Sequence, residues 1–373
     1  MHSFIETGGS VYGLGRSYHH GPESADRRGV VVKEFGCCLR RVCPMRLLKK
    51  NIQTKFVMSY PAMSVYEFEQ FKEEKEVLEY WKNSSIYIIC QRPVLFFDEI
   101  VPHEETGIIH LKIKQRNKEG ELSVKLAPMK DDPDFPDNRF MAEMNFFKKE
   151  QQTQHPFMNA AGIKFFNRDR KFIAWLSPER LIYDYLFKNW GFQIEIIGNI
   201  EEFLTYFVHY IGQAKNQYIW DRLTGHEKLS KVLAVEHPFI EGEFSPYELS
   251  LIFLRLDGTK ELFPIENDGS EEIVDFDGNI LTQEQFQQAI KETPFNELES
   301  FAVNDCEAYL INLFEPKYNK RLYRNYPDIG NGLKQLGFET IIHNCMLFAN
   351  LITEEATMSI TFHELESLET DPE

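Results

Sequence analysis

The chain has 373 residues and a formal net charge of −17 at pH 7, enough length for two or three hydrophobic cores and too much for one small disulfide-stapled unit. Its composition, 43% hydrophobic and 27% charged, is that of a water-soluble globular protein, and no stretch reaches the roughly 18 apolar residues that a membrane helix needs. We therefore expect a cytoplasmic protein of α+β class with no membrane partner.

Residues 1–57 form a basic leader. They hold ten Lys and Arg against four Asp and Glu, a net charge of +6, whereas the remainder carries −23. The leader lacks apolar periodicity, which predicts a poorly structured extension that is dispensable for folding and catalysis, with Met58 as an alternative start. An organellar targeting peptide is the other reading of an Arg-rich leader, but the four acids and the lack of a clean amphipathic helix weigh against it.

The six cysteines form no Cys-x-x-Cys pair, which argues against both a zinc site and a disulfide framework. Reduced thiols that pack as small apolar side chains are the simpler interpretation. Three lie in the leader, namely Cys37, Cys38 and Cys43. The other three, Cys90, Cys306 and Cys345, stand singly among apolar residues.

Residues 58–190 are expected to form a separate α+β domain that recognises a target or a protein partner. Apolar spacing predicts a helix over residues 66–82 and a capped helix over residues 177–186. The expected strands cover residues 86–90, 94–97, 108–113 and 122–126, followed by a hairpin over residues 165–176.

The next region, residues 191–327, opens with two alternating strands, residues 192–196 and 206–212. A period of two places Tyr206, Val208 and Tyr210 on one face of the second strand. A helix over residues 217–233 should follow, and Arg222 and His226 fall on its apolar stripe at i, i+4 spacing.

A third strand over residues 249–256 precedes a long helix over residues 297–314. Glu307 lies on the inward stripe of this helix, between Val303 and Leu310, where a carboxylate is costly unless a cation or hydrogen-bond donors meet it. Asn319 follows the helix inside a run of basic and aromatic residues. Residues 328–373 are expected to be an appendage with an acidic tail.

The segment Tyr210-Ile211-Gly212, followed by Arg222 and His226 and then by Glu307 and Asn319, resembles the GIY-YIG nuclease superfamily in order and spacing. The resemblance extends from residue 191 to about residue 327. It implies a small three-stranded sheet flanked by helices, preceded here by the separate α+β domain, and metal-dependent hydrolysis of DNA phosphodiester bonds.

The resemblance also implies a role for each residue. Tyr210 would lie near the attacking water, Arg222 would contact the scissile phosphate, and His226 would stand beside it. Glu307 would hold a divalent metal, Mg²⁺ in the simplest case, and Asn319 would brace the site. One carboxylate is an adequate protein ligand because Mg²⁺ keeps several of its waters, and a planar guanidinium suits the charge that builds on the phosphate oxygens.

The first motif of the family departs from this pattern. The nearest equivalent of the Gly-Ile-Tyr strand is Gly191-Phe192-Gln193, which has no tyrosine. The role of the first tyrosine is therefore unassigned, with Tyr206 or Tyr185 as possible substitutes.

Residues 191–325 carry eleven Lys and Arg against twenty-four Asp and Glu, a net charge of −13, which disfavours non-specific binding to DNA. A local basic patch must then supply the backbone contacts, and the candidates are Lys317, Lys320, Arg321 and Arg324. The sequence thus predicts a DNA endonuclease. The alternative is a catalytically inactive module of the same fold that binds protein or nucleic acid.

Overall fold

The computed structural model describes residues 50–128, 140–147, 154–187, 192–215, 217–225, 227–236, 245–262, 273–274, 280–281 and 295–358. The chain divides into two units, residues 1–46 and 47–373, and every described residue belongs to the second unit. Most of the leader, His226 and the acidic tail lie outside the described residues. The α+β class expected from the sequence is confirmed.

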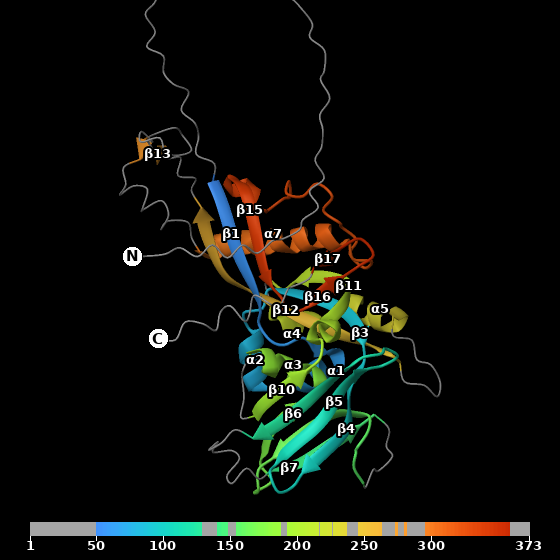
Figure 1. The fold of residues 1–373 in the computed structure, drawn as a ribbon. Helices are drawn as coiled ribbons and strands as arrows, with labels where there is room; N and C mark the ends of the chain where they lie inside the picture. The colour runs from blue at the N-terminus through green and yellow to red at the C-terminus, as the bar shows by residue number, and fades with distance from the viewer. Residues whose placement is uncertain are drawn as a thin grey trace, which may run out of the picture. The chain divides into compact units, whose positions relative to one another are not determined.

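The larger sheet has eight strands (Figure 1). Its central strands are antiparallel, with β12 (Tyr247–Leu262) between β1 (Lys50–Met58) and β3 (Ile86–Pro93), and β11 (Thr205–Gln213) on the other side of β3. At one end β15 (Phe338–Met346) runs parallel to β1. At the other end β16 (Asn350–Ile352) runs parallel to β11 and pairs with β17 (Thr357–Met358). The eighth strand, β2 (Met63–Ser64), pairs with β12.

Helices cover both faces of this sheet. Residues 86–90 of β3 are accordingly buried and apolar at every position, so the side chains on both faces of the strand need a covering layer. Ile86, Ile88 and Cys90 belong to the core that includes the inward face of α7 (Phe295–Phe314). Tyr87 and Ile89 point the other way. They pack in a second core with residues of four short helices, α1 (Val65–Phe71), α2 (Lys75–Trp81), α4 (Ile219–Leu223) and α5 (Glu227–Glu236).

The second sheet has seven strands and is antiparallel throughout. Its order is β10 (Phe192–Ile197), β6 (Glu121–Pro128), β5 (Ile108–Gln115), β4 (Leu95–His103), β8 (Ala160–Phe166) and β7 (Met141–Phe146), with β9 (Phe172–Leu176) paired to β8. Helix α3 (Pro178–Phe187) contacts β10, β4 and β9. All of these elements lie between β3 and β11 in the chain, so this sheet is an insertion between two neighbouring strands of the larger sheet.

Three short elements complete the description. They are the 3-10 helices η2 (Ile200–Leu204) and η3 (Leu333–Leu336), and the hairpin formed by β13 (Ile273–Val274) and β14 (Ile280–Leu281). Among the residues described, no helix is both long and apolar enough to cross a membrane.

The expected domain boundaries do not coincide with the sheets. The strand expected over residues 192–196 exists, but it pairs with β6 in the seven-stranded sheet, so the expectation that it opens a nuclease sheet is wrong. Residues 50–57, expected to belong to a dispensable leader, form β1 between β12 and β15. Residues 328–373 are likewise no appendage in their described part, because β15 and β16 are strands of the larger sheet.

Two long helices expected from apolar spacing are each broken into two. Residues 66–82 form α1 and α2, and residues 217–233 form α4 and α5 with a turn at Thr224 and Gly225 between them. Gly225 has φ +73°, a left-handed conformation that glycine adopts without strain and that ends a helix. Within α4 the buried residues are Ile219 and Leu223, so Arg222 is exposed rather than inward-facing, and Leu233 of α5 is 36% exposed.

The cysteines of the described residues match their expected state. Cys90, Cys306 and Cys345 are free thiols, the first two buried and the third half-buried. Cys37, Cys38 and Cys43 lie outside the described residues.

Candidate active site

Tyr210 does not share a face with Tyr206 and Val208, contrary to the expectation from a period of two. The pairing of β11 with β3 shifts between Val208 and Tyr210: Val208 is opposite Cys90 and Tyr210 is opposite Ile89. His209 is thus an extra residue, a β-bulge, and such a bulge turns the following side chains to the other face. Tyr210 consequently packs in the core of the short helices.

The bulge brings Tyr210 beside Tyr87 of β3. The two ring centroids are 6.0 Å apart. Tyr87 is directly opposite Gly212 in the register, and both rings pass over this glycine. A Cβ atom at Gly212 would lie 2.6 Å from the Tyr87 hydroxyl and 2.8 Å from Cε1 of Tyr210, so any side chain at this position would push the tyrosines apart.

Arg222, on α4, completes a polar chain with the two tyrosines. Burial raises the pKa of Tyr87, a hydrogen bond to Tyr210 raises it further, and a hydrogen bond from Arg222 opposes the rise. Burial also raises the pKa of Tyr210, which the hydrogen bond from Tyr87 opposes. The Arg222 guanidinium therefore donates to Tyr87, and Tyr87 donates to Tyr210. Both phenols keep their protons at neutral pH.

Glu307 lies on the inward side of α7, as expected, and is only 7% exposed. Its carboxylate accepts a hydrogen bond from Nε2 of Gln213, the last residue of β11, at 2.6 Å. Burial raises the pKa of Glu307 to about 7, and Lys215, the Gln213 hydrogen bond, Arg222 and Arg321 all act against this rise. Glu307 in turn raises the pKa of Tyr210, so the carboxylate, the arginine and the tyrosine belong to one electrostatic cluster.

Asn319 braces the strand that carries Tyr210. Its Oδ1 accepts from the backbone N–H of Ile211 at 3.0 Å, and its Nδ2 donates to the Ile211 carbonyl at 2.8 Å. The backbone N–H of Tyr318 donates to the His209 carbonyl at 3.1 Å. Strand β16 pairs with β11 only over Thr205–Phe207. The residues after α7 therefore provide hydrogen-bond partners for backbone groups of β11 beyond Phe207, where β16 no longer pairs with this strand.

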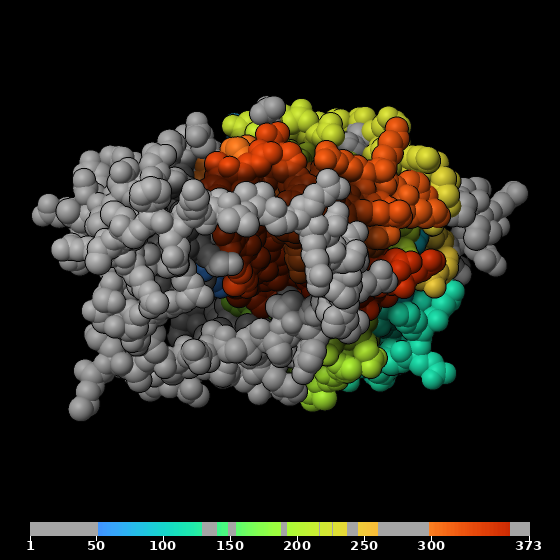
Figure 2. Space-filling model, turned by 90° about the horizontal axis from the view of Figure 1, so that it is seen from above, coloured from blue at the N-terminus to red at the C-terminus, as the bar shows by residue number. Residues whose placement is uncertain are grey.

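The four candidate DNA-binding cations do not form one equivalent set. Lys317 is ion-paired with Glu236 at the end of α5, at 2.6 Å, and Tyr318 donates to the same carboxylate oxygen at 2.5 Å. Lys320, Arg321 and Arg324 are exposed, and the Arg321 guanidinium lies 4.3 Å from the ring centroid of Tyr323. Figure 2 shows the residues after α7 (orange) beside the α4 and α5 region (yellow).

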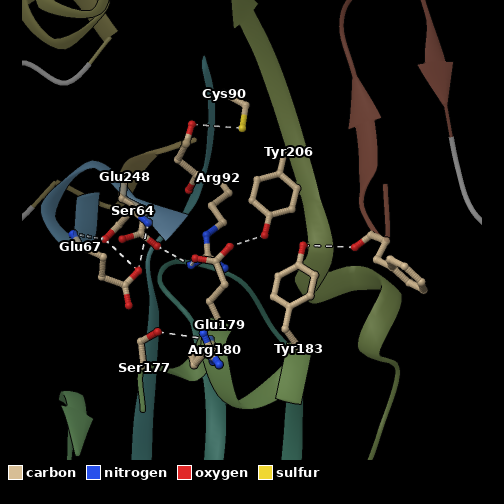
Figure 3. A network of polar contacts seen from close by, with 12 residues as sticks. Ser64, Glu67, Cys90, Arg92, Ser177, Glu179, Arg180, Tyr183, Tyr206 and Glu248 are labelled. Atoms are coloured by element: carbon tan, nitrogen blue, oxygen red, sulfur yellow. Dashed lines mark hydrogen bonds and ion pairs between the residues drawn. The ribbon is translucent and has the colours of Figure 1, made fainter. Parts of the chain in front are cut away.

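The tyrosines that the sequence offered in place of the first motif tyrosine lie elsewhere. Tyr206 is fully buried and donates to Glu179 of α3, in a network centred on the ion pair of Arg92 with Glu179 (2.7 Å) and Glu248 (2.8 Å) (Figure 3). Tyr185 is on α3, which packs against the seven-stranded sheet. Burial raises the pKa of Glu179 to about 8, against the attraction of Arg92.

Tyr87 is the site residue that sequence reasoning missed. Residues 86–90, which include it, were recognised as a strand but not as a motif, because the whole seven-stranded sheet separates Tyr87 from Tyr210 along the chain. The remaining candidates, Tyr210, Arg222, Glu307 and Asn319, are brought together by β11, α4, α7 and the segment after α7. His226 lies outside the described residues.

Within the described ranges, no three His, Cys, Asp or Glu side chains are grouped so that they could hold a metal ion. No protein-family model, curated protein or solved structure matches the chain.

Proposed function

We propose that the chain is a metal-dependent DNA endonuclease with a GIY-YIG-type site. The observation that carries the proposal is the convergence of Tyr87, Tyr210, Arg222 and Glu307 around the paired ends of β3 and β11. Tyr87 supplies the tyrosine that the sequence resemblance requires on the first strand and that residues 191–193 lack. Gly212 has no side chain, so the two tyrosine rings can meet over its backbone.

The donor set fits a hydrated Mg²⁺ ion. Glu307 is a buried carboxylate whose charged form is disfavoured by its surroundings, and a cation would offset that cost. A single carboxylate is sufficient because Mg²⁺ is often held by one or two carboxylates, several waters and phosphate oxygens. When bound, the ion would polarise a phosphate oxygen and stabilise its growing negative charge.

The side chains of the protein have distinct tasks in this reaction. The Arg222 guanidinium stabilises the negative charge on the non-bridging phosphate oxygens, because its planar group can donate two parallel hydrogen bonds to them. Tyr87 and Tyr210 are protonated and hydrogen-bonded to each other, so they orient the attacking water as neutral donors and acceptors rather than as phenolates. Asn319 holds the β11 backbone at Ile211, next to Tyr210 and Gly212.

The exposed cations Lys320, Arg321 and Arg324 follow Asn319 directly, and we assign them to the DNA backbone beside the site. Lys317 is assigned a weaker part because its ammonium already pairs with Glu236. The seven-stranded insertion remains the candidate surface for a protein partner.

The test is incubation of supercoiled plasmid with the purified full chain, with and without Mg²⁺. Wild type should convert the plasmid to nicked or linear forms only when Mg²⁺ is present, and Glu307→Gln should abolish this. Glu299→Gln is the matched control, because it removes a carboxylate from the same helix about two turns before Glu307. Equal cleavage by wild type and Glu307→Gln would refute the metal assignment, and no cleavage by wild type on any DNA would refute the proposal.

One observation favours the second candidate, a catalytically silent module that binds protein or nucleic acid. Gln213 already gives Glu307 a hydrogen bond of 2.6 Å, which a scaffold needs and a metal ligand does not. The two functions differ in their response to Mg²⁺. An enzyme is stabilised by the ion through Glu307, whereas a silent module is not.

A further inference from the structure

A stacked pair of aromatic side chains stands next to the proposed site. Tyr218 and Trp220 have ring centroids 4.3 Å apart and ring planes inclined by only 8°. Trp220 is the inner ring, because it packs against the core of the short helices. Tyr218 is the outer ring and remains 54% exposed. An exposed tyrosine stacked on a half-buried tryptophan presents a flat aromatic face to the solvent.

The position of this pair relates it to the phosphate site. Tyr218 precedes α4, and its backbone carbonyl accepts the N–H of Arg222 at 3.0 Å. Tyr218 is the N-cap residue of α4 and therefore lies one helical turn before Arg222. The pair is also close in the chain to Tyr210 of β11, because only a short segment, which begins after Gln213 and ends at Tyr218, connects β11 to α4.

A positively charged side chain lies near Tyr218. Lys82, at the end of α2, interacts electrostatically with Tyr218, in addition to its ion pair with Glu79. A flat aromatic surface with a neighbouring ammonium group and a neighbouring guanidinium matches one nucleotide, whose base stacks and whose phosphates are anionic.

We propose that Tyr218, supported by Trp220, stacks against an unpaired base of the DNA strand whose phosphate lies at Arg222. This inference rests on the proposed nuclease function and specifies its substrate: DNA with a single-stranded or unstacked nucleotide at the cleavage point, as in the locally unpaired segments of a negatively supercoiled plasmid, rather than a relaxed duplex. Bases in an intact duplex have no free face, so a stacking residue at the site selects strands in which a base is already exposed.

The test compares two probes and four proteins. The probes are a short fluorescein-labelled single DNA strand and a strand of the same length whose nucleotides are all abasic, which keeps every phosphate and removes every base. Affinities are measured by fluorescence anisotropy at low salt in EDTA, so that no cleavage occurs. The proteins are wild type, Tyr218→Ala, Tyr218→Phe and the control Tyr66→Ala, which removes an exposed tyrosine from α1.

Wild type should bind the normal strand roughly 5- to 150-fold more tightly than the abasic strand, the range expected for one stacked base. Tyr218→Ala should lose most of this preference without weaker binding of the abasic strand, and Tyr218→Phe and Tyr66→Ala should keep it. The inference is overturned if wild type shows no preference, if Tyr218→Ala keeps it, or if that variant loses the same factor on both strands.

Should Tyr218→Ala unfold, Tyr218→Leu replaces it, because leucine keeps apolar bulk without a flat ring. The plasmid assay separates this inference from the proposed function. Cleavage of plasmid without any preference between the strands refutes base stacking and leaves the nuclease intact. A preference that depends on Tyr218, without cleavage of any substrate, supports the stacking surface and refutes the nuclease.

Discussion

Replacement of Glu307 by Gln should make the protein inactive and, at high pH, more stable. The pKa of Glu307 is raised from 4.5 to about 7 by burial. Between these values the folded chain keeps a proton that the unfolded chain releases, so folding stability falls as the pH rises through this window. At about 1.4 kcal/mol for each pKa unit, the ionised carboxylate costs about 3 kcal/mol once the pH exceeds 7.

Glu307→Gln removes this cost while keeping an oxygen that can accept from Gln213. The free energy of unfolding, measured by urea titration, should differ little between variant and wild type at pH 4. At pH 8 the variant should be more stable by about 3 kcal/mol. Glu179 and Asp184 also have raised pKa values, but they titrate in both proteins and cancel in the difference. A difference that does not change with pH would refute the burial argument.

Mg²⁺ supplies a second readout from the same two proteins. At pH 8 and at about 100 times its dissociation constant, the ion should stabilise wild type by about 2.7 kcal/mol, because it binds only the folded chain. Glu307→Gln should not respond, and Glu299→Gln should respond like wild type. Equal stabilisation of all three proteins would place the metal elsewhere and favour the silent module.

Three further expectations follow from the site and the fold. Arg222→Lys and Tyr87→Phe should each lower the cleavage rate by roughly 10²-fold, the size typical of one preorganised donor, and changes below threefold would mean that neither group contacts the reacting phosphate or water. The urea midpoint should stay unchanged for Arg222→Lys and fall for Tyr87→Phe, which removes a buried hydrogen-bonded hydroxyl. A chain starting at Met58 should fail to fold cooperatively, because it lacks β1 and its buried Ile52, Thr54 and Phe56, whereas a chain starting at Leu47 keeps β1 and should melt like the full chain; equal melting of both would show that β1 is dispensable. Replacement of Lys320, Arg321 and Arg324 by Ala should reduce the slope of log affinity against log salt by roughly 2 to 3, whereas Lys317→Ala should change it less because of Glu236.

The parts of the site that the sequence predicted are those determined by local pattern. The strand of Tyr210, the helix of Glu307 and the following Asn319 are specified by apolar spacing and by a proline after the helix, and the structure has them as expected. The orientation of Tyr210 could not be predicted, because the bulge at His209 is decided by pairing with β3 and not by the residues of β11. The exposure of Arg222 was missed because the expected long helix ends at Leu223, and in this short helix the buried residues are Ile219 and Leu223.

The role of β1 was missed because its first six residues are mostly polar. Residues 50–55 are Lys-Asn-Ile-Gln-Thr-Lys, with Ile52 as their one apolar side chain, which resembles the basic segment before them. Its burial follows from its partners on both sides, β12 and β15, and these come from distant parts of the chain. Pairing across such separations leaves no local signal.

The insertion between β3 and β11 explains how one chain can separate two site tyrosines by a complete sheet and still bring them together. In the antiparallel pairing, Gln91 is opposite Phe207 at one end and Ile86 is opposite Gln213 at the other. The inserted sheet leaves from the first end, where the two strand ends are already neighbours, and insertions are tolerated where chain ends lie close. The buried Arg92–Glu179 ion pair anchors the insertion at this end. Tyr87, Gly212 and Gln213 stand at the opposite end, so the insertion can vary without moving the residues of the proposed site.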